Sequence, residues 1–183
     1  MKTIIKRVKK TSQSIVKMDS NLRDILQLIK DKKNACIVIL DELTDTHNVG
    51  AIIRSSVATN ADAIVVSKHH QAPINETVMR TSANTADMIP IVTMNINEAI
   101  RVIKDHKFWV HGLHMDGENT LWKSDLTGKV AIVVGSEENG IHAVTKKLCD
   151  FNLAIPMNNR VESLNASVSV AVALYERFRQ ISK

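Results

Sequence analysis

The chain alternates short, wholly apolar runs with longer segments of helical periodicity. The apolar runs lie at residues 35–40, 63–67, 88–92, 108–113, 130–135 and 151–156. Runs of this length without an alternating polar face are typical of parallel strands covered on both faces. Helices are predicted between and after them, at residues 48–59, 74–82, 96–107, 141–148 and 164–181. The pattern predicts a single α/β domain with a mainly parallel sheet and flanking helices.

One more helix is predicted before the first apolar run. Asp19 or Ser20 is a suitable N-cap for the segment NLRDILQLIKDKK. The apolar positions of this segment recur at helical spacing and mark one face: Leu22, Ile25, Leu26 and Ile29. We therefore divide the chain into a basic arm with a linker helix, residues 1–34, and one globular domain, residues 35–183.

The stretch SLNASVSV, residues 163–170, has an ambiguous pattern. Polar and apolar residues alternate in it as in a half-buried strand, whereas the following VAVALYERFRQI suits a helix. The polar positions are small and uncharged: Ser163, Asn165, Ser167 and Ser169. Periodicity alone does not decide whether these side chains belong to a strand, a helix or a binding site.

The positive charge of the chain is concentrated at its N-terminus. The net charge is +5, but residues 1–18 contain six basic side chains and no acidic one, which leaves a net charge of −1 for the remainder. The basic residues of this arm are Lys2, Lys6, Arg7, Lys9, Lys10 and Lys17. Such an arm either contacts nucleic-acid phosphates, with release of counterions, or is a solvated terminus.

The composition is that of an ordinary globular protein, with 44% hydrophobic and 23% charged residues. Cys36 and Cys149 lie far apart inside apolar runs, which favours buried thiols over a disulfide or a catalytic thiol. No apolar run approaches the roughly 20 residues of a membrane span, and no signal-peptide core follows the basic N-terminus. We expect a cytoplasmic protein without a membrane partner.

Candidate chemistry is expected in the loops after the apolar runs, because ligands of open parallel sheets bind beyond the carboxyl ends of the strands. In the first of these loops, Asn48 is either a helix N-cap or a site residue. Arg54 is a lone cation on a largely apolar helix, and a guanidinium buried there would need anionic partners. The loop GSEENG, residues 135–140, has two glycines that permit backbone to approach a ligand closely, but it matches no nucleotide-binding signature.

Metal and serine chemistry are not indicated by the sequence. The histidine pairs His69–His70 and His111–His114 lack further ligands at zinc-like spacing. No G-x-S-x-G elbow marks a serine nucleophile. We therefore expect no metal cofactor.

Three motifs, in register, resemble those of the SpoU (TrmH-type) family of RNA ribose 2′-O-methyltransferases within the SPOUT superfamily. The family patterns are Asn-x-Gly-x-x-x-Arg, Gly-x-Glu-x-x-Gly, and Ile-Pro-Met followed by Ser-Leu-Asn. The matching positions are Asn48, Gly50 and Arg54, then Gly135, Glu137 and Gly140, and finally Ile155, Pro156, Met157, Ser163, Leu164 and Asn165. The resemblance runs from about residue 35 to the C-terminus, and it is closest to the bacterial subgroup that methylates a guanosine in 23S ribosomal RNA.

Four positions depart from the family pattern. Thr46 stands where proline is common, Asn60 and Asn84 stand where glycine is common, and Glu138 stands where a second glycine often follows the motif glutamate. Asparagine tolerates a left-handed backbone better than most residues do, so we expect the two asparagines to keep the local conformation.

Members of the subgroup usually carry an N-terminal RNA-binding domain, and the segment KTIIKRVKK resembles its last strand. The chain thus resembles the catalytic domain of this subgroup without the N-terminal RNA-binding domain, of which only the last strand would be present.

The resemblance implies a fold, a cofactor and a partner. The fold would be a parallel α/β sheet with a C-terminal trefoil knot, in which S-adenosylmethionine is held largely by backbone groups. Cofactor contacts are implied for Leu113, Gly135, Ile155 and Leu164. Family members are homodimers, so the C-terminal helix either contributes to a dimer contact or only to the core of its own chain. The residues in question are Ala171, Ala173, Leu174 and Phe178.

The resemblance also implies the reaction and the catalytic groups. Arg54 would either stabilise developing alkoxide charge or remove the 2′-hydroxyl proton; a guanidinium is almost always protonated, which favours the first role. Asn48, Glu137, Ser163 and Asn165 would position Arg54, the cofactor and the ribose. The reaction would be methyl transfer from S-adenosylmethionine to a ribose 2′-hydroxyl of RNA, most simply of a 23S ribosomal RNA guanosine. A transfer-RNA or small-molecule methyltransferase and a non-catalytic RNA-binding factor remain as alternatives.

Overall fold

The computed structural model describes residues 21–158 and 160–182. They contain one seven-stranded sheet of order β3-β2-β1-β6-β4-β7-β5, in which every neighbouring pair is parallel. The strands are β1 (Ala35–Asp41), β2 (Ala63–Ser67), β3 (Ile91–Met94), β4 (Trp109–Leu113), β5 (Asn119–Thr120), β6 (Lys129–Gly135) and β7 (Phe151–Ala154). The predicted α/β class with a parallel sheet is confirmed. The trefoil knot stays a prediction.

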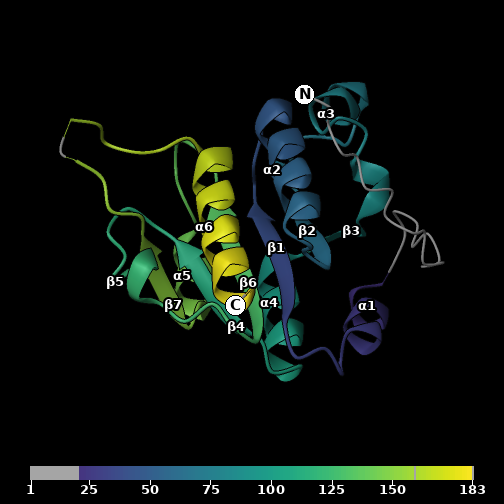
Figure 1. Cartoon of the computed structure of the whole chain (residues 1–183). Helices are drawn as coiled ribbons and strands as arrows, with labels where there is room; N and C mark the ends of the chain where they lie inside the picture. The colour runs from purple at the N-terminus through teal and green to yellow at the C-terminus, as the bar shows by residue number, and fades with distance from the viewer. Residues whose placement is uncertain (1–20, 159, 183) are drawn as a thin grey trace, which may run out of the picture.

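Helices cover both faces of the sheet (Figure 1). They are α1 (Leu22–Leu28), α2 (Thr46–Ala58), α3 (Glu76–Thr81), α4 (Ile96–Asp105), α5 (Ala143–Leu148) and α6 (Ala166–Ile181). Helices α2, α3 and α6 share one apolar core with one face of the sheet, and α1, α4 and α5 pack on the other face. Strand β1 supplies alternate residues to the two cores, for example Val38 to the first and Ile37 to the second. Two covered faces explain why its sequence is a continuous apolar run.

Helix α1 packs into the second core through all four residues of its predicted apolar face, which are buried. Its N-cap is Asn21, whose side-chain oxygen accepts a hydrogen bond from the backbone N–H of Arg23. The candidate caps Asp19 and Ser20, and the basic arm before them, lie outside the described residues. The division of the chain at residue 34 stays a prediction.

Three element boundaries differ from the predicted ones for identifiable reasons. The run at 88–92 is not a strand from its start, because a 3-10 turn occupies Ala86–Met88 and β3 begins only after Pro90, which has no N–H to donate. Helix α2 begins earlier than predicted, with Asp45 as its N-cap, so the capping role considered for Asn48 is wrong. Helix α6 begins at Ala166, so the alternation in residues 163–170 does not mark a strand.

The departures from the family's glycine positions are explained by the backbone. Asn60 and Asn84 have φ angles of 57° and 59°, in the left-handed region that glycine would otherwise occupy. The expected compatibility of asparagine with these two turns is confirmed. Both residues end a helical segment, Asn60 after α2 and Asn84 after α3.

The described residues show no sign of a reactive thiol, a membrane-spanning helix or a metal cluster. Cys36 is buried, Cys149 is half-buried and both are free; burial raises the pKa of each thiol to about 12, so both are protonated at neutral pH. Within residues 21–158 and 160–182, every helix is too short or too polar to cross a membrane. The same residues contain no cluster of three or more His, Cys, Asp and Glu side chains suited to a metal ion.

Candidate active site

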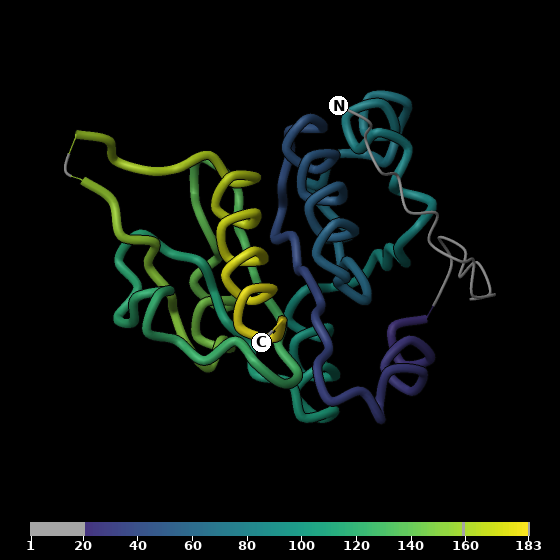
Figure 2. Tube along the Cα trace, in the orientation of Figure 1, coloured from purple at the N-terminus to yellow at the C-terminus, as the bar shows by residue number. Residues whose placement is uncertain are grey.

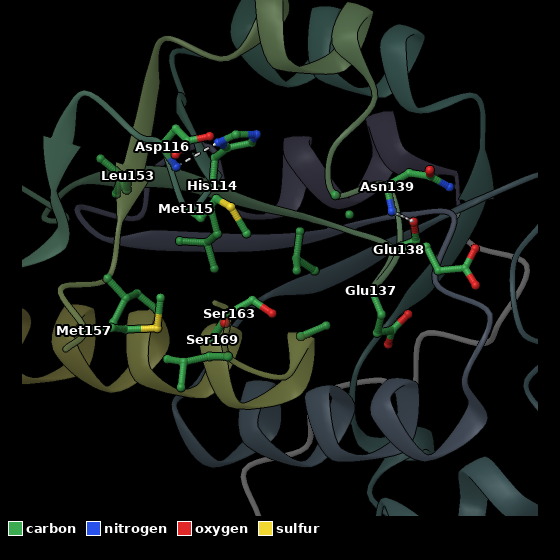
Figure 3. A pocket seen from close by; sticks show the side chains of 18 residues that line it. His114, Met115, Asp116, Glu137, Glu138, Asn139, Leu153, Met157, Ser163 and Ser169 are labelled. Atoms are coloured by element: carbon green, nitrogen blue, oxygen red, sulfur yellow. Dashed lines mark hydrogen bonds between the residues drawn. The ribbon is translucent and has the colours of Figure 1, made fainter. Parts of the chain in front are cut away.

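A pocket of about 340 Å³ opens at the carboxyl ends of β4, β6 and β7 (Figure 3). Three loops surround it. The segment after β4 contributes His114 to Asp116, the loop after β6 contributes residues 135–140, and the segment before and within α6 contributes Ser163 and Ser169. This is the edge of a parallel sheet where ligands are expected.

The loop after β6 folds back tightly on the end of its own strand. Gly140 donates its N–H to the carbonyl of Ser136 at 2.9 Å, and the two residues form an antiparallel bridge. A Cβ at Gly135 would lie 1.9 Å from the carbonyl oxygen of Gly140, and Gly140 itself has φ +62°. The two motif glycines are therefore required for different reasons, close approach at 135 and left-handed backbone at 140.

The same loop is tied to helix α2 by a hydrogen bond between motif residues that are 89 positions apart. The side-chain amide of Asn48 donates to the Glu137 carboxylate. Asn48 is only 5% exposed, whereas Glu137 is exposed on the pocket side and lines the cavity. The bond therefore fixes the orientation of a carboxylate at the rim of the pocket.

We expect the Asn48–Glu137 bond to contribute about 1 kcal/mol to folding. Glu137→Ala leaves the buried Asn48 amide without its acceptor, so it should destabilise the protein, while the double variant with Asn48→Ala should cost less than the sum of the single changes. Unfolding free energies of the four proteins in urea measure this coupling. Glu138→Ala, which removes the neighbouring exposed carboxylate, is the control; an additive double variant would contradict the expectation.

The third motif contributes four residues to the pocket and one to a helix start. The pocket residues are Ile155, Met157, Ser163 and Leu164. Asn165 does not line it; its side-chain oxygen caps α6 by accepting from the N–H groups of Ser167 and Val168 at 2.9 and 3.3 Å. Figure 2 shows the described parts of the segment between β7 and α6, on either side of residue 159, extending away from the sheet. Asn165 thus holds the end of the loop in place.

Arg54 is exposed, which corrects the interpretation of it as a buried cation. It does not line the pocket, and among the described residues no hydrogen bond or ion pair holds its guanidinium. The reason is the rotation of α2 on the sheet: Ile52 and Ile53 face the core, and the next helical position points to solvent.

Met115 and Asp116 are pocket residues that were not predicted from the sequence, and His114, also in the lining, was considered only as a metal ligand. The N–H of Asp116 donates to His114 Nδ1 at 3.1 Å, and Lys146 Nζ lies 3.3 Å from His114 Nε2. All three directly follow β4, at the carboxyl end of a strand where ligands of parallel sheets bind, so this position could have identified them.

A pair formed by a histidine and a carboxylate outside the pocket connects the loop after β6 to the end of β1 and the residue that follows it. The backbone N–H of His142 donates to Asp41 at 3.0 Å, and its Nε2 lies 2.9 Å from the Glu42 carboxylate. The hydrogen bond to Glu42 raises the pKa of His142 above its ordinary value of 6.5.

We expect this pair to make stability depend on pH. Because the pKa of His142 is raised in the folded state, its contribution is fully present below pH 6.5 and is lost as the pH rises through the raised pKa. Thermal unfolding should therefore show a larger loss for His142→Gln on the acidic side than on the alkaline side. His69→Gln, a change at another exposed histidine, is the control. A loss independent of pH would contradict the role of the charged imidazole.

The sequence profile of the SpoU rRNA methylase family matches residues 35–175. The chain belongs to the SpoU rRNA methylase family. Among curated relatives of this SpoU chain, the 23S rRNA (guanosine-2′-O-)-methyltransferase RlmB of Xylella fastidiosa (strain 9a5c) is 39% identical over 80% of this chain and 59% of its own length. The enzyme of the same name from Escherichia coli (strain K12) is 34% identical over 87% of this chain and 66% of its own length.

Solved structures of SpoU proteins share the fold. The SpoU methyltransferase AviRb of Streptomyces viridochromogenes, in complex with AdoMet, has a TM-score of 0.78 at 26% identity and covers 83% of this chain and 60% of its own. An AdoMet-bound rRNA methyltransferase of Sinorhizobium meliloti has a TM-score of 0.81 at 26% identity, over 89% of this chain and 61% of its own. This SpoU chain thus spans about three fifths of the length of several of the proteins it matches.

Proposed function

We propose that this chain transfers a methyl group from S-adenosylmethionine to a ribose 2′-hydroxyl of RNA, with a guanosine of 23S ribosomal RNA as the substrate. The observation that carries the proposal is that motif residues far apart in the sequence line one pocket at the carboxyl edge of the sheet. The curated relatives named for this reaction, and the AdoMet-bound SpoU structures, support it. The residues proposed to hold the cofactor are Leu113, Gly135, Ile155 and Leu164.

The pocket suits S-adenosylmethionine in shape and charge. Leu113, Leu153 and Ile155 offer apolar surface for an adenine ring, and the backbone at Gly135 can be approached without a side chain in the way. Asp116 and Glu137 place carboxylates at the rim, which suit a cationic ligand. When bound, S-adenosylmethionine supplies a methyl group already activated by the sulfonium.

The chain has to place the 2′-oxygen in line with that methyl group and to stabilise the charge left when the hydroxyl loses its proton. We assign the second task to Arg54, because its guanidinium is exposed and can meet an RNA backbone. Glu137, oriented by Asn48, and Ser163 are assigned to positioning the ribose. Asn165 would act indirectly, by fixing the loop that carries Ser163.

We also propose a homodimer, with one face of α6 in the contact. Ala173 and Leu174 do not belong to that face, since they are buried in the core of their own chain. Residues 168, 171, 175 and 178 are spaced i, i+3, i+7 and i+10 and lie on one side of the helix. They form an apolar stripe in which Val168 and Tyr175 are 46% and 54% exposed.

Tyr175→Arg should weaken such a dimer, because it places a charge in an apolar contact. Sedimentation velocity of the wild type and the variant over a range of concentrations measures the effect, and we expect a shift toward monomer. Arg101→Glu, a charge change on exposed surface of α4, is the control. A wild-type protein that is monomeric at all concentrations would remove the dimer from the proposal.

The decisive experiment for the reaction uses S-adenosylmethionine with a labelled methyl group. Binding of the cofactor is first measured by calorimetry, and the protein is then incubated with total RNA from cells lacking the gene. We expect label in 23S ribosomal RNA, mapped to the 2′-oxygen of one guanosine. Cofactor binding without labelled RNA would indicate a non-catalytic RNA-binding factor, and label in transfer RNA would show that the assigned substrate is wrong.

A further inference from the structure

A second hollow lies at the opposite edge of the sheet from the cofactor pocket, and no family motif contributes to it. It has a volume of about 560 Å³ and lies at the amino ends of the same three strands, where Trp109 begins β4, Lys129 begins β6 and Phe151 begins β7. Strands β4 and β7 are neighbours in the sheet (Figure 1). We call this hollow the amino-end pocket.

Its floor is aromatic and partly open to solvent. Trp109 and Phe151 are 57% and 40% exposed, and their ring centroids lie 5.8 Å apart. His111 stacks on Phe151 at 5.2 Å with an interplanar angle of 20°. The chain has only six Phe, Trp and Tyr residues, so two exposed rings in one hollow are an unusual use of them. Exposed apolar surface at a hollow indicates a binding partner.

His111 supplies unused hydrogen-bonding groups beneath this floor. Its side chain is 2% exposed, and within the described part of the chain neither ring nitrogen has a hydrogen-bond partner. Burial lowers the pKa of His111 to about 4, so at neutral pH the ring is neutral and carries one donor and one acceptor. Buried polar atoms are nearly always paired in folded proteins, so the two ring nitrogens of His111 offer hydrogen bonds to a ligand or an ordered water in this hollow.

The wall of the amino-end pocket is basic. Lys107, Lys123 and Lys129 line it, and Lys107 and Lys123 are exposed. Lys129 is already engaged, because its Nζ donates to the carbonyl of Lys30 at 2.5 Å. The acidic residue in the lining, Asp125, accepts from the N–H and the hydroxyl of Thr127 at 2.9 and 2.7 Å. Among the described residues, neither Lys107 nor Lys123 has a hydrogen-bond or ion-pair partner for its side chain, so two ammonium groups in the lining are available to an anionic ligand.

We propose that the amino-end pocket binds an unpaired RNA nucleotide, with its base stacked on Trp109 and its flanking phosphates on Lys107 and Lys123. His111, stacked on Phe151, lies beneath the rings on which the base would rest. Stacking on aromatic rings beside a basic groove is how proteins hold single-stranded RNA. This inference rests on the proposed function, because it gives the RNA substrate a second point of attachment remote from the methyl-transfer site.

Trp109 and Trp122 are the only tryptophans, which allows a direct optical test. In a Trp122→Phe variant, Trp109 is the sole tryptophan, and a short single-stranded oligoribonucleotide should quench its fluorescence saturably. In the Trp109→Phe variant the remaining Trp122, which is exposed but outside the pocket, should respond little. Adding Lys107→Ser and Lys123→Ser should make the negative slope of log affinity against log salt shallower by about 1.4, because two phosphate contacts are lost.

A second readout concerns the substrate. Trp109→Ala should raise KM for a 23S ribosomal RNA fragment by roughly 5- to 150-fold, with kcat and the affinity for S-adenosylmethionine unchanged. Trp122→Ala is the matched control. Methyl transfer with unchanged KM in Trp109→Ala, together with no quenching of Trp109, would overturn the pocket and leave the proposed function standing. Quenching without any methyl transfer would support the pocket and count against the proposed function.

Two further ligands identify the source of the binding chemistry. A mononucleotide that binds as tightly as the oligoribonucleotide would overturn the assignment to RNA, because phosphates on both sides would then add nothing. Poly-glutamate that quenches Trp109 as strongly as RNA would also overturn it, since charge alone would account for binding. Weak binding of both, beside tight binding of the oligoribonucleotide, is the expected result.

Discussion

Arg54→Ala should reduce methyl transfer by a factor of about 10² to 10³ and leave the affinity for S-adenosylmethionine and the thermal stability nearly unchanged. The first effect is the usual result of removing a group that stabilises charge in the transition state. The second follows from the structure, because Arg54 is exposed and lies outside the pocket lining. Single-turnover methylation, calorimetry with the cofactor and thermal unfolding measure the three quantities.

Two further variants separate a specific role of Arg54 from a general effect of charge. Arg101→Ala removes an exposed guanidinium from α4, on the other face of the sheet, and should be nearly without effect. Arg54→Lys keeps the charge but loses the planar fork that grips phosphate, so it should recover only part of the activity. Wild-type turnover in Arg54→Ala would remove this residue from the mechanism.

The parts of the fold that were predictable are those whose sequence admits one solution. Runs such as ACIVIL and AIVVS have no polar face, so only a strand covered on both sides satisfies them, and β1 and β2 lie where the runs predict. Strand β5 was missed because two residues carry no period. The onset of α6 was obscured because Ser167 and Ser169 lie in the first turns, where their hydroxyls bond to Asn165.

The site, like the fold, has features that local sequence can predict and features that depend on how distant elements pack. The loops after the strands were predicted to meet at one edge of the sheet, and Gly135, at the end of β6, and Leu164, before α6, do line one pocket there. It could not give the exposure of Arg54, which depends on how α2 is rotated against the sheet. The amino-end pocket was beyond reach for a related reason. Trp109, Lys129 and Phe151 meet only because the strand order places β4 between β6 and β7.

Gly135→Ala should abolish measurable binding of S-adenosylmethionine and lower the melting temperature by roughly 6–12 °C, equivalent to about 3 kcal/mol. The new Cβ would lie 1.9 and 2.0 Å from the carbonyl oxygen and carbon of Gly140, and those backbone atoms cannot move unless the whole loop moves. That loop carries Glu137, so its displacement changes the rim and the floor of the pocket together.

Gly128→Ala tests whether this loss is specific. Gly128 has φ +72° and open space around its Cβ position, so alanine there meets only backbone strain of about 1–2 kcal/mol, at the far edge of the sheet. This variant should melt somewhat lower than the wild type and bind the cofactor normally. Calorimetry on both variants, below their melting temperatures, compares them. If Gly135→Ala bound the cofactor as well as Gly128→Ala, the tight return of the loop onto β6 would not be what shapes the pocket.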